Sequence, residues 1–264
     1  MDVGAESSLI LSTADAVAGL QEEVAAGTRS VIPWPERCLD IALIVLVAPI
    51  LALVALALAA AVYVDSPGPV LYRSRRVGRD GQVFAMLKFR KMRREAHSQP
   101  LTLEDDERFT PIGNFLAATR LDELPQVVNI LRGDMRLVGP RPELECFVAE
   151  FAEEYAEIVT VSPGLTGNAQ LRFVGEKALF SGASPETAYT DHIMPAKVAI
   201  DLDYVRHHSL TRDVLIIART VALPFELLVD RLRASSGSLR VWIPTVACAA
   251  LLVLAFFVTS ASLS

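Results

Sequence analysis

Two adjacent carboxylates, Asp122 and Glu123, are the residues whose type and spacing are best suited to chemistry. Pro125 follows them closely, and Gly133 comes one short helix later. This pattern predicts a helix that begins at Asp122, carries the proline in its first turn and ends at the glycine. Free N–H groups and the positive dipole end favour an ionised carboxylate there, and they would also bind a phosphate. An ionised Asp122 could therefore attack phosphorus.

Glu123 supplies a second carboxylate, which could bind a divalent metal ion or act as a base. The alternative is an acidic first turn that only complements the helix dipole. For an isolated Asp-Glu pair this alternative is the commoner one, so the choice depends on the surrounding sequence.

A second chemical feature is Arg141, which lies between Pro140 and Pro142. The prolines restrict the backbone on both sides of the arginine. A guanidinium held in this way is suited to bidentate binding of a phosphate. A structural ion pair is the alternative interpretation.

Positive charge is concentrated between Arg73 and Arg94, although the whole chain has a net charge of −6. A basic block beside an apolar segment indicates contact with anionic lipid or phosphate, and a solvated basic surface is the alternative. Lys88 and Arg90 flank Phe89 in a strand pattern, so they share a face. They could hold a diphosphate or a lipid phosphate, or they could contact lipid headgroups.

The elements that position these residues begin with an apolar segment, Ile41–Val64, in which Pro49 is the one helix breaker. At 1.5 Å per residue it spans about 36 Å, enough for a bilayer core of about 30 Å. A proline inside a helix kinks it. Since basic residues lie on both sides of the segment, the sequence favours a re-entrant hairpin over a bent span. A second apolar segment, Val241–Val258, is expected to form a transmembrane helix, with a membrane-lying or core helix as the alternative.

The remaining pattern predicts an α+β fold, mostly helical, with a small β-hairpin. The hairpin strands are expected at Val70–Tyr72 and Val83–Lys88, and helices from about 185 to 206 and 210 to 233. A short helix is expected within Leu9–Val24. We predict four parts: an N-terminal, partly disordered extension (1–33), a membrane helix (34–64), a catalytic domain (65–233) and a C-terminal apolar helix (240–259).

Several motifs resemble the bacterial sugar transferases, the monotopic phosphoglycosyl transferases. They occur in one order from about Arg37 to Leu223: Ser66-Pro-Gly-Pro-Val70, Lys88-Phe-Arg-Lys-Met92, Arg120-Leu-Asp-Glu-Leu-Pro-Gln126, Leu131-Arg-Gly-Asp-Met-Arg-Leu-Val-Gly-Pro-Arg-Pro-Glu143, Pro163-Gly-Leu-Thr-Gly167, Ala169-Gln-Leu-Arg172 and Tyr204 to Asp213.

The resemblance implies a re-entrant helix kinked at Pro49 and a catalytic domain on the cytoplasmic face of the bacterial inner membrane. It also implies that Asp122 is the nucleophile toward a UDP-sugar, that UMP leaves, and that a phospho-aspartyl sugar intermediate forms. Polyprenyl (undecaprenyl) phosphate would then accept the sugar phosphate, the first membrane step of polysaccharide or glycoconjugate synthesis. Magnesium would be required, with Asp122 and Glu123 as its ligands.

The resemblance and the residue types together give a set of substrate-binding candidates. It comprises Arg141, Lys88, Arg90, Arg120, Arg172, Glu176, Pro140 and Gln170. Arg172 and Glu176 could contact the nucleotide or sugar, or they could pair with each other. No motif names the sugar, and a homodimer stays open. A lipid-binding scaffold and a nucleic-acid binder are the competing classes, and the Asp-Glu pair with the Gly-Pro-Arg-Pro loop argues against both.

Overall fold

The computed structural model describes residues 13–22, 24, 33–93, 106–174, 187 and 189–235. The chain divides into two compact units, Met1–His208 and Ser209–Ser264. The first unit carries helices and two small sheets, and the second carries α10 (Leu210–Ser235). The described chain is mostly helical with a small hairpin, as predicted. The predicted C-terminal helix Val241–Val258 lies outside the described residues.

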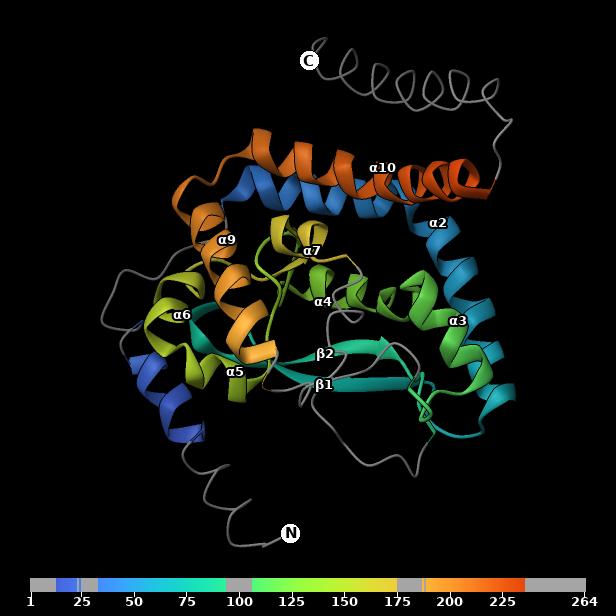
Figure 1. Ribbon diagram of the computed structural model, residues 1–264, viewed down its shortest axis with the longest axis horizontal. Helices are drawn as coiled ribbons and strands as arrows, with labels where there is room; N and C mark the ends of the chain where they lie inside the picture. Colours follow the sequence, from blue (N-terminus) through green and yellow to red (C-terminus); the bar gives the residue numbers. More distant parts are fainter. Residues whose placement is uncertain are drawn as a thin grey trace, which may run out of the picture. The chain divides into compact units, whose positions relative to one another are not determined.

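The apolar segment forms one long helix, α2 (Trp34–Asp65), with Pro49 inside it. Figure 1 shows α2 as two arms that meet at a bend, which is what an interior proline produces. Its most apolar 18-residue window has a mean hydropathy of 3.1, and 6% of that window is buried. By length and composition, α2 is therefore able to cross a membrane.

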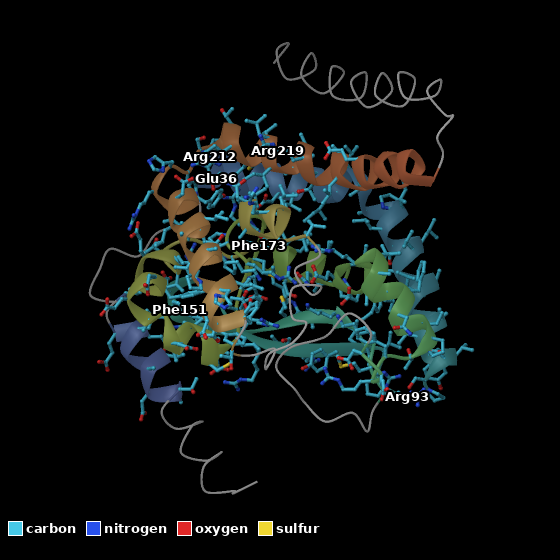
Figure 2. All side chains as sticks on the ribbon, viewed as in Figure 1. Glu36, Arg93, Phe151, Phe173, Arg212 and Arg219 are labelled. Atoms are coloured by element: carbon cyan, nitrogen blue, oxygen red, sulfur yellow. The ribbon has the colours of Figure 1, made fainter. Side chains whose placement is uncertain are left out.

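The N-terminal arm of α2 is fixed to the first unit by buried ion pairs. Arg136 forms ion pairs with Glu36, labelled in Figure 2, and with Asp40, whose Oδ2 lies 3.2 Å from its Nε. Arg37 on the same arm donates to the carbonyl oxygen of Leu131 at 2.9 Å. These polar contacts hold the start of an otherwise apolar helix against the domain.

The C-terminal arm of α2 packs on the same unit through apolar contacts. Val62 shares a core cluster with Phe89 and Leu116. The Arg90 guanidinium donates to the carbonyl oxygen of Ser66, the residue that follows the helix. Both ends of α2 thus contact one compact unit.

The predicted hairpin consists of β1 (Leu71–Val77) and β2 (Val83–Phe89), which pair antiparallel. The strands are longer than the sequence pattern predicted. Since Tyr72 lies opposite Lys88 and Arg76 opposite Phe84, these four side chains share one face of the hairpin. This face carries the charge that reaches the carboxylate pair.

The carboxylate pair lies between α3 (Pro111–Thr119) and α4 (Gln126–Arg132), in the 3₁₀ turn η2 (Leu121–Glu123). The prediction that Asp122 caps a helix was wrong, because α4 begins only after Pro125. Gly133 ends α4 as predicted, with a left-handed φ of 93°. Arg120, between α3 and η2, also adopts a left-handed φ, 56°.

A second, parallel strand pair, β3 (Arg136–Val138) and β4 (Gly164–Thr166), was not predicted. Strand β4 lies within the Pro163-Gly-Leu-Thr-Gly167 motif. A Cβ on Gly164 would lie 2.1 Å from the Gly139 nitrogen, so only glycine permits this approach. The pair is followed by α7 (Asn168–Arg172).

The largest core cluster joins the remaining helices of the first unit. These are α5 (Glu145–Glu150), α6 (Ala152–Ile158), the π-turn η4 (Tyr189–Ile193) and α9 (Met194–Arg206). Residues 13–22 are helical, as predicted, and Val17 and Leu20 are buried in this cluster. The core therefore lies beside β1 and supports the loop that carries Arg141.

Candidate active site

Glu123 is held by two cations. The Arg141 guanidinium donates to both oxygens of its carboxylate, and Lys88 Nζ lies 3.1 Å from Oε1. Burial favours the neutral acid, but the charges and hydrogen bonds of Arg141 and Lys88 outweigh it and lower the pKa of Glu123 well below 4.5. Glu123 is therefore ionised at neutral pH and is a weak base.

The two cations respond to this contact in opposite ways. Burial lowers the pKa of Lys88 from 10.5 to about 8, although the charge of Glu123 opposes the shift. The charge of Glu123 raises the pKa of Arg141, although burial opposes it. Arg141 thus keeps its charge at any pH, whereas the charge of Lys88 depends on pH just above neutrality.

Asp122 has a separate partner. Its side chain is 4% exposed, and its Oδ2 lies 3.1 Å from Lys91 Nζ. The two carboxylates of the pair are thus surrounded by three cations, Lys88, Lys91 and Arg141. The surplus of positive charge suits a site that receives a further anion.

Asn129 fixes α4, and with it the carboxylate turn, to the hairpin. Its Oδ1 accepts from the Leu87 backbone N–H at 2.9 Å, and its Nδ2 donates to the Ala85 carbonyl oxygen at 2.9 Å. Figure 1 shows α4 lying along β2. This connection keeps Lys88 on β2 within reach of Glu123.

The loop that carries Arg141 is fixed on both sides. Gly164 donates its backbone N–H to the Pro140 carbonyl oxygen at 2.8 Å, and Val77 donates to the Glu143 carbonyl oxygen at 3.1 Å. The predicted restriction by two prolines is thus supplemented by hydrogen bonds to β4 and β1. Because the loop is held at both ends, the Arg141 guanidinium is already oriented before a substrate binds.

The family model described as bacterial sugar transferase matches residues 32–226. The chain belongs to the bacterial sugar transferase family. The matched residues include α2, the hairpin, the carboxylate turn and the Arg141 loop, so the family assignment predicted from the motifs is confirmed.

Relatives of this chain include transferases whose names are of the predicted type. The UDP-glucose:undecaprenyl-phosphate glucose-1-phosphate transferase of Caulobacter vibrioides is 37% identical over 198 residues, which cover 73% of this chain and 70% of that protein. The UDP-N-acetylgalactosamine-undecaprenyl-phosphate N-acetylgalactosaminephosphotransferase of Aeromonas hydrophila is 35% identical over 202 residues, 73% of this chain and 45% of that protein. The exopolysaccharide production protein PSS of Rhizobium leguminosarum bv. phaseoli is 36% identical over 200 residues, 70% of this chain and 92% of that protein.

The matched part of the chain thus spans less than half of the length of one of these relatives and most of the other two. The first two are named for different sugars at nearly equal identity. The names bear out the predicted type of enzyme, a sugar-1-phosphate transferase, and leave the sugar open.

The other predicted binding residues of this family member differ in their surroundings. Arg90 is engaged with the Ser66 carbonyl oxygen, and Arg120 and Arg172 are exposed. Pro140 is buried beside Arg141. Glu176 lies outside the described residues.

Gln170, on α7, is buried, and neither polar atom of its amide has a hydrogen-bond partner in the described chain. An unpaired buried amide costs about 1–3 kcal/mol, so it is an unusual feature of a native core. Its predicted role in substrate binding stays a prediction.

Two basic residues of the site, Lys91 and Arg76, were not predicted as site residues. Lys91 lies beyond the end of β2, so strand alternation did not place it with Lys88. Arg76 lies 3.4 Å from the Glu143 carboxylate, on the same hairpin face as Lys88. The dense basic block was the available signal, but it did not say which members point inward.

The donor set fits a magnesium ion in its chemistry, because Asp122 and Glu123 offer the carboxylate oxygens that this ion prefers. The two residues are not equally available. Glu123 is bound by two cations, whereas Asp122 contacts one lysine. A metal ion would therefore compete with fewer contacts at Asp122.

Proposed function

We propose that this protein transfers a sugar-1-phosphate from a UDP-sugar to a membrane polyprenyl phosphate such as undecaprenyl phosphate and releases UMP. The observation that carries the proposal is the buried Asp122 carboxylate beside Lys91, next to a Glu123 that two further cations hold. A nucleophile surrounded by surplus positive charge suits attack on an anionic diphosphate.

In the first step, a carboxylate oxygen of Asp122 attacks the phosphorus that carries the sugar. The new bond joins this oxygen to phosphorus, and the bond to the oxygen of the neighbouring phosphate breaks, so that UMP leaves. Lys91, Lys88 and Arg141 neutralise the phosphoryl oxygens as charge shifts toward the leaving group. The product is a phospho-aspartyl sugar on Asp122.

In the second step, a phosphate oxygen of the polyprenyl carrier attacks the same phosphorus. The bond between phosphorus and the Asp122 oxygen breaks, which restores the carboxylate and yields a polyprenyl diphosphate sugar. Dividing the reaction in this way avoids a direct encounter of two anionic substrates. Magnesium, bound by Asp122 with Glu123, would supply additional positive charge against the diphosphate.

The ionised Glu123 has a further part in this proposal. Because its pKa is held well below 4.5, it is a poor proton acceptor at neutral pH. It instead holds Lys88 and Arg141 together next to Asp122. The incoming diphosphate would exchange for Glu123 at these two cations.

We further propose that α2 enters and leaves the cytoplasmic leaflet of the bacterial inner membrane without crossing it. Both arms contact the same unit, through Arg136 at one end and Leu116 at the other. A spanning helix would separate its ends by a hydrocarbon core of about 30 Å. The apolar middle, for example Ile50 and Leu53, which are 67% and 71% exposed, would then lie among the lipid tails.

The reaction is tested by UMP release from purified, detergent-solubilised protein with magnesium, polyprenyl phosphate and a panel of UDP-sugars. Wild type is expected to release UMP from one or more donors, and Asp122→Asn to release none, whereas Asp191→Asn, an exposed acid in η4, retains activity. Without acceptor, mass spectrometry should find the sugar-phosphate adduct on Asp122. No UMP from any donor would refute the proposed function.

The placement of α2 is tested with single-cysteine variants in sealed vesicles. Cys38 is exposed near the start of α2, Ser66 follows its end, and Cys146 is an exposed marker on α5. A membrane-impermeant maleimide should label Cys38, Ser66→Cys and Cys146 from the same side. If the sites at the two ends of α2 label from opposite sides, the helix spans.

A further inference from the structure

A buried chain of hydrogen bonds lies behind the Arg141 loop. Lys197 Nζ donates to the Tyr189 hydroxyl at 3.0 Å, and this hydroxyl donates to Oε1 of Glu143 at 3.0 Å. Arg76 approaches the other oxygen, Oε2, at 3.4 Å. Glu143 therefore receives one partner from the hairpin and one from the π-turn before α9.

These residues are as buried as the core around them. Glu143 is 7% exposed, Tyr189 4% and Lys197 8%. The ring of Phe173, labelled in Figure 2, lies 6.0 Å from Lys197 Nζ at the end of α7. A buried carboxylate whose two oxygens both accept hydrogen bonds is held in one position, since loss of any partner leaves an unpaired polar group.

Glu143 is two residues from Arg141, and the same contacts constrain the intervening residue. Arg76 also approaches the Pro142 carbonyl oxygen, at 3.4 Å, while the Glu143 backbone accepts from Val77. With the proline limiting rotation between them, the position of the Glu143 carboxylate restricts where the Arg141 guanidinium can point. The chain of hydrogen bonds thus affects the Arg141 guanidinium through the backbone of the loop.

A second buried carboxyl, Asp201, lies near this chain of hydrogen bonds but does not displace Glu143 from it. Asp201 lies one turn after Lys197 on α9, and burial together with the charge of Glu143 raises the pKa of Asp201 to about 8. A neighbouring acid that prefers its neutral form does not compete for the cations. Tyr189 and Lys197 therefore remain assigned to Glu143.

We propose that Tyr189 and Lys197 are positioning residues for the transfer reaction, which hold Arg141 at the substrate phosphate through Glu143. The inference rests on the proposed function. Neither residue touches the Asp122–Glu123 pair. Their effect passes through the Pro142–Glu143 segment.

The test removes the Tyr189 hydroxyl and retains its ring, which packs against Phe147 with the ring centroids 4.9 Å apart. Tyr189→Phe is expected to lower kcat/KM for the UDP-sugar about ten-fold, the effect of about 1.4 kcal/mol. The matched control is Tyr155→Phe, a tyrosine 4% exposed in the same core cluster, whose hydroxyl is not part of the Lys197–Tyr189–Glu143 chain of hydrogen bonds. It should change kcat/KM less than two-fold.

A double-mutant cycle separates positioning from general stability. If Tyr189 acts through Arg141, Tyr189→Phe should cost about ten-fold in wild type and much less in an Arg141→Lys background. Equal costs in both backgrounds, or an unchanged Tyr189→Phe in an active wild type, would overturn the positioning role alone. A wild type that releases no UMP would overturn the proposed function, and the positioning role with it.

Discussion

The buried Lys88 makes the activity of this protein sensitive to pH in a defined window. Its pKa is lowered from 10.5 to about 8 by burial, and its side chain is 14% exposed beside Glu123. Below pH 8 it carries the charge that the proposed mechanism uses against the phosphoryl oxygens. Above pH 8 it becomes neutral, so we expect activity to fall as the pH rises.

The size of the effect follows from the titration of one group. With a pKa of about 8, about one tenth of Lys88 is protonated at pH 9, so kcat/KM for the UDP-sugar should fall about ten-fold between pH 7 and pH 9. Bound diphosphate would favour the charged lysine, so the fall in kcat should come at a higher pH than the fall in kcat/KM.

Over the same pH range, the titration of Lys88 affects stability and activity in opposite directions. Between pH 8 and 10.5 the unfolded chain binds a proton that the folded chain does not, so the contribution of Lys88 to the free energy of unfolding rises with pH. A pKa difference of one corresponds to about 1.36 kcal/mol. The lowered pKa of Lys88 therefore reduces the free energy of unfolding by about 3 kcal/mol at neutral pH, and this reduction disappears as the pH rises from 8 to 10.5. Loss of activity above pH 8 would therefore not reflect destabilisation of the fold by the titration of Lys88.

The assay is initial-rate UMP release from pH 6.5 to 10, with thermal unfolding measured at each pH. Lys88→Arg is the matched variant, because a guanidinium keeps its charge throughout this range. It should remove the fall above pH 8, even if its maximal rate is lower. A wild-type profile that is flat to pH 9.5, or an arginine variant with the same fall as wild type, would refute the assignment to Lys88.

Two further predictions concern the anchoring of the site. Arg136→Met removes the guanidinium that pairs with two buried carboxylates, and it should lower the free energy of unfolding by about 3–5 kcal/mol in urea melts. Arg75→Met, which removes a side chain that is 75% exposed, should cost less than about 1 kcal/mol, and equal costs would contradict the anchoring role. Gly113→Ala places a Cβ 1.9 Å from the Lys91 carbonyl oxygen, so it should separate α3 from the end of β2, destabilise the fold by about 1–3 kcal/mol and reduce UMP release. Gly19→Ala, where nothing lies within 4 Å, should leave stability unchanged or raise it slightly, and a neutral Gly113→Ala would show that the two backbones are not closely packed.

The strongest patterns in the sequence, an apolar run and strand alternation, predicted the elements they belong to. An apolar run of this length with one proline leaves few alternatives to the bent helix α2, and the alternating strands around a Gly-rich turn specify the hairpin. The parallel pair β3–β4 could not be predicted, because three-residue strands carry no usable periodicity. Their pairing depends on the close approach of Gly139 and Gly164, which are far apart in the sequence.

The site was predicted in its residues more than in its geometry. The motifs pointed to Asp122, Glu123 and Arg141, and the structure brings Glu123 and Arg141 into contact. Their electrostatics were assigned to a helix N-terminus, whereas α4 begins after Pro125 and the positive charge comes from side chains. Which lysine faces which carboxylate depends on where β2 ends, and a local pattern does not define a strand end to one residue.

The 3₁₀ turn explains why two adjacent carboxylates can have different roles. Successive residues on a tight turn point in different directions, so Asp122 meets Lys91 while Glu123 meets Lys88 and Arg141. Two cations neutralise the glutamate, and a carboxylate so strongly held is a poor nucleophile as well as a poor base. Asp122, with one lysine, keeps the freer oxygens and is the better candidate to attack phosphorus. The division of labour within the pair therefore follows from the distribution of three cations over two carboxylates.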